Sequence, residues 1–270
     1  MEKYEADGHL TVTTKLITAD VTNLYTMIPR IGALEALMRF LEKYSKRGKI
    51  GTLSIDHIMK MARLVLDTNC FAYQNKYYKQ IRGGAMGSAF TQVLANIYML
   101  EWEHGLIEHQ ISHNELYGRY VQIIKQQVTF HIIIYFIFRY IDDIFMTTNL
   151  STDAIQKELQ KAQNKDINIK IDYKLDLCVD YLDVAVKNEN GHLRTSIFHK
   201  PSAEPYILPY TSDHPHHMHR NIPYEALMRA AGLCSNVHDF DMERIRIDLA
   251  LLLNDYPPDL FLNTFIAFFI

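Results

Sequence analysis

The chain has 270 residues, of which 48% are hydrophobic and 22% charged, with only eight prolines and eleven glycines. This composition excludes a disordered, collagen-like or low-complexity chain. The cysteines Cys70, Cys178 and Cys234 form no CxxC pair, which argues against a disulfide framework and a thiolate zinc site. The 28 basic and 31 acidic residues give a net charge of −3, which taken alone disfavours a nucleic-acid partner.

The charge is unevenly distributed. Residues 30–82 contain eleven basic and four acidic side chains, a net of +7, and the rest of the chain has a net of −10. The sequence therefore predicts a basic region beside acidic sites.

The patterning predicts an α+β fold with antiparallel strands that carry acids and are backed by helices. In chain order we expect a strand over 11–19 that ends at Asp20, helices over 29–43 and 55–68, a glycine-rich loop over 83–88 (GGAMGS), and a helix over 89–103. There follow two strand pieces over 140–147, a helix over 151–164, a strand over 167–173, a β-hairpin over 179–198, and helices over 224–234 and 242–253.

Three aspartates stand at the ends of predicted strands: Asp20, Asp142 and Asp143. Adjacent aspartates in a regular strand point to opposite faces, so Asp142 and Asp143 can share a site only at a tight hairpin. Clustered carboxylates repel one another unless a cation neutralises them, and oxygen ligands favour Mg²⁺. The pattern is typical of a two-metal phosphoryl-transfer site, and the alternative for Asp142-Asp143 is an exposed turn.

Three ordered motifs resemble the palm of reverse transcriptases, and more narrowly those of Penelope-like retroelements, relatives of telomerase's catalytic subunit. The motifs are TADVTNLYTMIP (18–29), GGAMGS…LANIY (83–98) and YIDD (140–143). The resemblance implies a polymerase right-hand palm over 1–205, interrupted at 120–139, and a partial helical thumb over 206–270. The expected activity is RNA-directed DNA synthesis, with an RNA template, a DNA primer and dNTPs as partners. The alternative is a catalytically inactive, truncated retroelement remnant that at most binds nucleic acid.

The resemblance also implies a role for particular residues. Asp20, Asp142 and Asp143 correspond to the catalytic ligands of two Mg²⁺ ions, for which Mn²⁺ could substitute. Val21, Tyr25, Gly87 and Ser88 correspond to nucleotide-binding positions, with Tyr25 sensing the sugar 2′ position. Tyr140, His199 and Lys200 correspond to primer and template contacts. Lys165, Lys170 and Lys174 are candidates for the residue that protonates the leaving pyrophosphate.

Residues 120–139 (YVQIIKQQVTFHIIIYFIFR) interrupt the third motif. Excising them joins the flanks as LYGRYIDDIF, which is how the family reads, and the segment corresponds to 60 nucleotides. We therefore interpret it as a translated, unspliced intron, with a family-specific loop as the alternative; sequencing the transcript distinguishes the two. The exposed apolar run within it is expected to lower solubility and to displace Asp142 and Asp143.

Further expectations concern the ends and the partners of the chain. The family's fingers and endonuclease domain would lie upstream and downstream of it, and residues 260–270 are interpreted as a core helix rather than a lipid anchor. With no signal peptide and no transmembrane span predicted, an intracellular location is expected, and the resemblance implies a nuclear one. A zinc or nickel site at His214, His216, His217 and His219 is a competing reading, against a solvated connection.

Overall fold

The structure is a computed structural model, and it describes residues 2–118, 142–202, 204–205 and 207–268. The chain divides into two compact units, one formed by residues 17–174 and the other by residues 1–16 and 175–270. The sequence-based division into a palm over 1–205 and a thumb over 206–270 stays a prediction. Tyr140 and the interruption at 120–139 lie outside the described residues.

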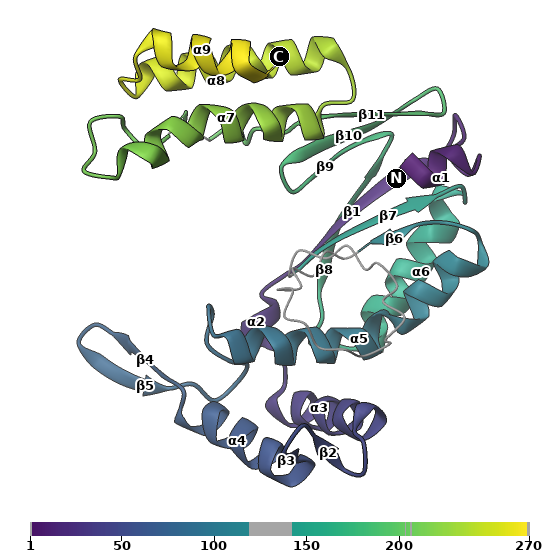
Figure 1. The fold of residues 1–270 in the computed structure, drawn as a ribbon. Helices are drawn as coiled ribbons and strands as arrows, with labels where there is room; N and C mark the ends of the chain where they lie inside the picture. Colours follow the sequence, from purple (N-terminus) through teal and green to yellow (C-terminus); the bar gives the residue numbers. More distant parts are fainter. Residues whose placement is uncertain (1, 119–141, 203, 206, 269–270) are drawn as a thin grey trace. The chain divides into compact units, whose positions relative to one another are not determined.

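The unit of residues 17–174 is built on a four-stranded sheet in the order β6-β7-β1-β8 (Figure 1). Its strands are β1 (Lys15–Val21), β6 (Tyr117–Gly118), β7 (Asp143–Thr148) and β8 (Ile171–Asp176). Its helices are α2 (Leu24–Met27), α3 (Arg30–Tyr44), α4 (Ile55–Thr68), α5 (Ala89–Ser112) and α6 (Thr152–Lys165). Two small hairpins complete it, β2 (Lys49–Ile50) with β3 (Leu53–Ser54), and β4 (Cys70–Tyr73) with β5 (Lys76–Lys79).

Helix α5 is the packing centre of this unit because it contacts both α3 and α6. Its buried positions include Leu94, Met99 and Trp102, and the Trp102 indole N–H donates to the Ala162 carbonyl oxygen of α6 at 2.7 Å. A partnered indole can be buried without loss of hydrogen bonding. Helix α5 extends nine residues beyond the expected end at residue 103.

The second unit combines a three-stranded antiparallel sheet with three helices. The sheet order is β11-β10-β9, from β9 (Cys178–Tyr181), β10 (Val184–Glu189) and β11 (His192–Ile197). The predicted hairpin over 179–198 is confirmed, but its first arm is split by a tight turn at Leu182-Asp183, where Leu182 has φ 55°. Helix α1 (Glu2–Ala6) precedes this sheet in the chain, and α7 (His216–Leu233), α8 (Val237–Leu253) and α9 (Pro258–Phe268) follow it.

Helices α7, α8 and α9 enclose a small apolar core of Leu227, Ala230, Ile247, Leu251, Tyr256 and Phe261. Phe261 belongs to α9, so the apolar C-terminal stretch is a core helix, as predicted. Within the residues that the structure describes, no helix is both long enough and apolar enough to cross a membrane.

Candidate functional site

The three predicted catalytic aspartates lie where β1 ends and β7 begins, at one end of the two central strands of the four-stranded sheet. The Val21 N–H at the end of β1 donates to the Asp142 carbonyl oxygen at 3.0 Å, one residue before β7 begins at Asp143. The next residue, Thr22, donates its N–H to the Lys170 carbonyl oxygen at 2.9 Å, directly before β8. The end of β1 therefore lies between the starts of β7 and β8, and the strand that carries Asp20 runs opposite to both neighbours.

Asp20 is within the electrostatic reach of two other carboxylates. Partial burial raises the pKa of Asp20 above its ordinary value, and the negative charges of Asp142 and then Asp172 raise it further. Asp172 was not among the predicted site residues. It lies on β8, and its carboxylate accepts a hydrogen bond from the Thr22 hydroxyl at 3.2 Å. No motif signals this proximity, because it depends on β8 pairing with β1.

The chemistry of these side chains suits Mg²⁺, since all the donors are hard carboxylate oxygens. Over the described part of the chain, however, no group of three His, Cys, Asp or Glu side chains is gathered closely enough to hold a metal ion. The donor type therefore suits Mg²⁺, but the carboxylates are not gathered around a single coordination point. The same finding applies to the alternative zinc or nickel site: among the described residues, His214, His216, His217 and His219 form no metal-binding cluster. His219 is buried, and its Nε2 lies 3.3 Å from the Ser212 carbonyl oxygen.

The first two glycines of the GGAMGS loop hold that loop against the segment after Asp20. The Gly84 N–H donates to the Tyr25 carbonyl oxygen at 2.9 Å, and the Gly83 N–H donates to the Ile28 carbonyl oxygen at 3.0 Å. A Cβ atom on Gly83, where φ is +61°, would lie 2.2 Å from the Tyr25 carbonyl oxygen. Only glycine permits this approach, so the glycine-rich motif and the Asp20 motif form one structural unit through their backbones.

The other predicted loop residues have different surroundings. Gly87 has φ +81° with open space around it, and the Ser88 hydroxyl accepts the Thr91 N–H at 3.4 Å as the N-cap of α5. Capping accounts for a serine at this position without any ligand. Gly87 and Ser88 therefore stay predictions as nucleotide-binding residues, as do Val21, whose N–H is used in the sheet, and Tyr25, which is half-buried in α2.

His199 and Lys200 belong to the other compact unit and follow β11. The His199 Nε2 lies 2.7 Å from the buried carboxylate of Glu243 on α8, and Lys200 is exposed. Of the candidate lysines, Lys165 donates to the Glu101 carbonyl oxygen at 2.7 Å and is thereby tied to α5. Lys170 lies beside the end of β1 through its backbone contact with Thr22.

Comparison with solved structures shows a telomerase-like, polymerase-like fold. Telomerase from Candida albicans in complex with the TWJ fragment of telomeric RNA aligns with a TM-score of 0.62 at 9% identity, over 99% of this chain and 46% of that one. Apo telomerase from Candida tropicalis aligns with a TM-score of 0.53 at 11% identity, over 99% and 45%. The chain thus spans less than half the length of these telomerase chains.

The sequence was also compared with protein-family models and with curated proteins. Residues 206–266 match the family described as an animal helix-turn-helix domain, and no curated protein matches the chain. The matched residues contain α7, α8 and most of α9 and carry eight acidic and four basic side chains, a net of −4. This charge disfavours contact with a phosphate backbone.

Proposed function

We propose that the chain is the RNA-directed DNA polymerase domain of a retroelement of the Penelope-like type, with an RNA template, a DNA primer and dNTPs as substrates. The observation that carries the proposal is the backbone bond from Val21 to Asp142, which joins the strand end of Asp20 to the start of the strand of Asp143. The telomerase-like fold supports the same proposal.

In the proposed reaction the primer 3′-hydroxyl attacks the α-phosphate of the dNTP, a new O–P bond forms, and pyrophosphate leaves with its electron pair. Asp20, Asp142 and Asp143 would hold Mg²⁺, or Mn²⁺ in its place. When bound, such ions supply a lowered hydroxyl pKa and neutralise the charge that develops on the phosphate.

In this scheme the chain's own residues position the substrates and supply a proton. The hydrogen bond from the Val21 N–H to the Asp142 carbonyl oxygen holds the end of β1 beside the start of β7, which supports a shared site for Asp20, Asp142 and Asp143. Tyr25, Gly87 and Ser88 would face the nucleotide, and Tyr140, His199 and Lys200 the primer and template. We propose Lys170 as the donor of a proton to pyrophosphate, because its backbone lies beside the end of β1.

Primer extension on an RNA template with the recombinant chain tests the proposal. Asp142→Asn should reduce incorporation at least 100-fold, because it removes a charged ligand that acts in the transition state. Asp153→Asn, the same change in the first turn of α6, is the matched control and should retain activity. Incorporation that persists in Asp142→Asn would refute the site.

A second arm uses the chain without residues 120–139, since only Tyr140 and Ile141 separate the interruption from Asp142. Absence of incorporation in both the full and the shortened chain would contradict the polymerase proposal. The inactive retroelement remnant would then be the better reading.

A further inference from the structure

The β4–β5 hairpin is an exposed arm of the unit of residues 17–174 (Figure 1). All eight residues of its two strands are exposed, and they are joined by a two-residue turn at Gln74 and Asn75, which have φ 48° and 60°. Both turn residues are in the left-handed region, the geometry that matches the twist of a two-stranded hairpin. The hairpin is therefore well defined although none of its strand residues is buried.

Four aromatic side chains lie on this arm. Tyr77 is 85% exposed, and Phe71, Tyr73 and Tyr78 are each more than 40% exposed. The strand register places Phe71, Tyr73 and Tyr78 on one face and Tyr77 on the other. Phe71 and Tyr78 form a stacked cross-strand pair with ring centroids 5.6 Å apart, so open aromatic faces are presented on both sides of the arm.

The arm is also basic. Residues 69–82 contain Lys76, Lys79 and Arg82 and no acidic residue. Arg82 is anchored to the Met27 carbonyl oxygen at 3.1 Å. Lys76 and Lys79 are both exposed residues of β5.

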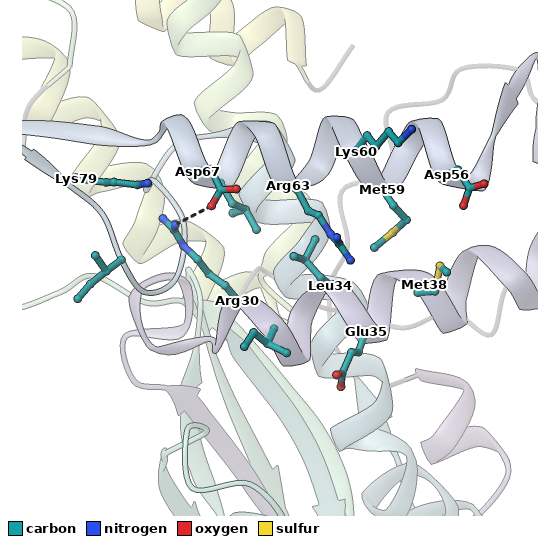
Figure 2. Close-up of a pocket in the computed structure, with 13 residues that line it drawn as sticks. Arg30, Leu34, Glu35, Met38, Asp56, Met59, Lys60, Arg63, Asp67 and Lys79 are labelled. Carbon is teal, nitrogen blue, oxygen red and sulfur yellow. Dashed lines mark ion pairs between the residues drawn. The ribbon is translucent and has the colours of Figure 1, made fainter.

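Lys79 borders a groove of about 910 Å³ between α3 and α4 (Figure 2). Arg30, Lys60 and Arg63 also line the groove, together with three acidic residues. Arg30 and Lys79 lie toward the same end of the groove in Figure 2, where Arg30 Nη1 is 3.9 Å from an Asp67 carboxylate oxygen. Lys60 and Arg63 are exposed residues of α4, so their cationic groups are accessible along the groove.

We propose that the β4–β5 hairpin and this groove bind a single strand of nucleic acid. The exposed rings stack on bases, and Lys76, Lys79 and the groove cations contact phosphates, the combination used by proteins that bind single strands without sequence preference. Charge selects this occupant: residues 30–82 carry +7, whereas the rest of the chain carries −10. The identification of the strand as the template rests on the proposed function, but the binding itself does not.

The test is fluorescence anisotropy of labelled rU20 and dT20 with the full chain, in EDTA and without dNTPs, so that polymerase failure cannot affect it. Tyr73→Ala with Tyr77→Ala spares the Phe71–Tyr78 stack and should weaken binding about 5- to 150-fold for each base that loses a stacking partner. Lys76→Ala with Lys79→Ala should reduce the slope of log K against log salt by about 1.4.

The controls carry the same changes elsewhere in this unit. Tyr44→Ala removes a half-exposed tyrosine of α3, and Lys157→Ala with Lys161→Ala removes two exposed lysines of α6. Both should bind as the wild type does, and circular dichroism should show all variants folded. Equal losses in the controls, unchanged binding by the hairpin variants, or no binding of either oligonucleotide at low salt would overturn the proposal. Selective binding of rU20 over dT20 would support it and show that the 2′-hydroxyl is read.

Discussion

Deleting residues 120–139 should convert the connection between β6 and β7 into a tight hairpin. Gly118 pairs with Phe145 across these strands, and 26 residues lie between the two. The deletion leaves six, and the same register then pairs Arg119 with Ile144 and Tyr140 with Asp143. Ile141 and Asp142 become the two turn residues, so the deletion leaves a two-residue hairpin turn and keeps the register of the strands.

Two favourable contributions and one unfavourable contribution set the expected gain in unfolding free energy. Shortening the closed loop from 26 to six residues contributes about 1.3 kcal/mol from loop entropy. Two new ladder hydrogen bonds contribute about 2 kcal/mol net, and a left-handed Ile141 in the turn costs about 1–2 kcal/mol. The shortened chain should therefore be more stable by about 1.3–2.3 kcal/mol.

Urea unfolding of the full and the shortened chain, followed by circular dichroism, measures this difference. A third chain, with 120–139 replaced by twenty Gly and Ser residues, keeps the loop length and removes the apolar run. It should match the full chain in unfolding free energy but exceed it in soluble yield. A lower unfolding free energy for the shortened chain would refute the reasoning, because residues 120–139 would then contribute to the folded state.

Two further predictions concern the loop and the acids. Gly83→Ala should lower the unfolding free energy by about 3 kcal/mol or more, because the new Cβ would meet backbone atoms and φ is positive. Gly87→Ala, where φ is also positive but the space is open, should lower it by about 1–2 kcal/mol. Equal losses for the two variants in urea unfolding would contradict the predicted contact at Gly83. The raised pKa of Asp20 favours its protonated form in the fold, so stability is retained below about pH 3.8 and lost as the pH rises through the raised value. Asp20→Asn should therefore have a higher Tm than the wild type at pH 7 and a similar Tm at pH 3.5. Mg²⁺ should raise the Tm of the wild type more than that of the variant. An unchanged Tm difference across pH would show that the fold does not raise the pKa of Asp20.

Elements with strong local patterns were predicted well. Helix α4 spans residues 55–68 as expected, with Ser54 as its N-cap, and the helix expected over 151–164 is α6, with Ser151 as its N-cap. The strand before Asp20 was placed too early, because β1 covers Lys15–Val21 and includes the aspartate. The predicted strand over 167–173 begins only at Ile171, since residues 167–170 form a turn and its exit.

The surroundings of Asp142-Asp143 show what a local pattern leaves open. Strand pieces were expected on both sides of this pair; the piece after it is β7, and the piece before it lies outside the described residues. The pairing of β7 with β6 at Tyr117–Gly118, before the interruption, was not predicted. The β4–β5 hairpin and the early start of α7 were not predicted either. Gln74-Asn75 is a weaker turn signal than Asn-Gly, and Pro223 lies inside α7, where proline normally argues against a helix.

Hydrophobic periodicity, caps and glycines were enough to establish an α+β chain with acids at strand ends, because these signals act over a few residues. The proximity of Asp172 to Asp20, the contact of Gly83 with the Tyr25 carbonyl oxygen, and the pairing of His199 with Glu243 were decided by the tertiary structure. Each joins positions far apart in the chain, and strand order and helix packing, which bring them together, leave no mark in the local sequence.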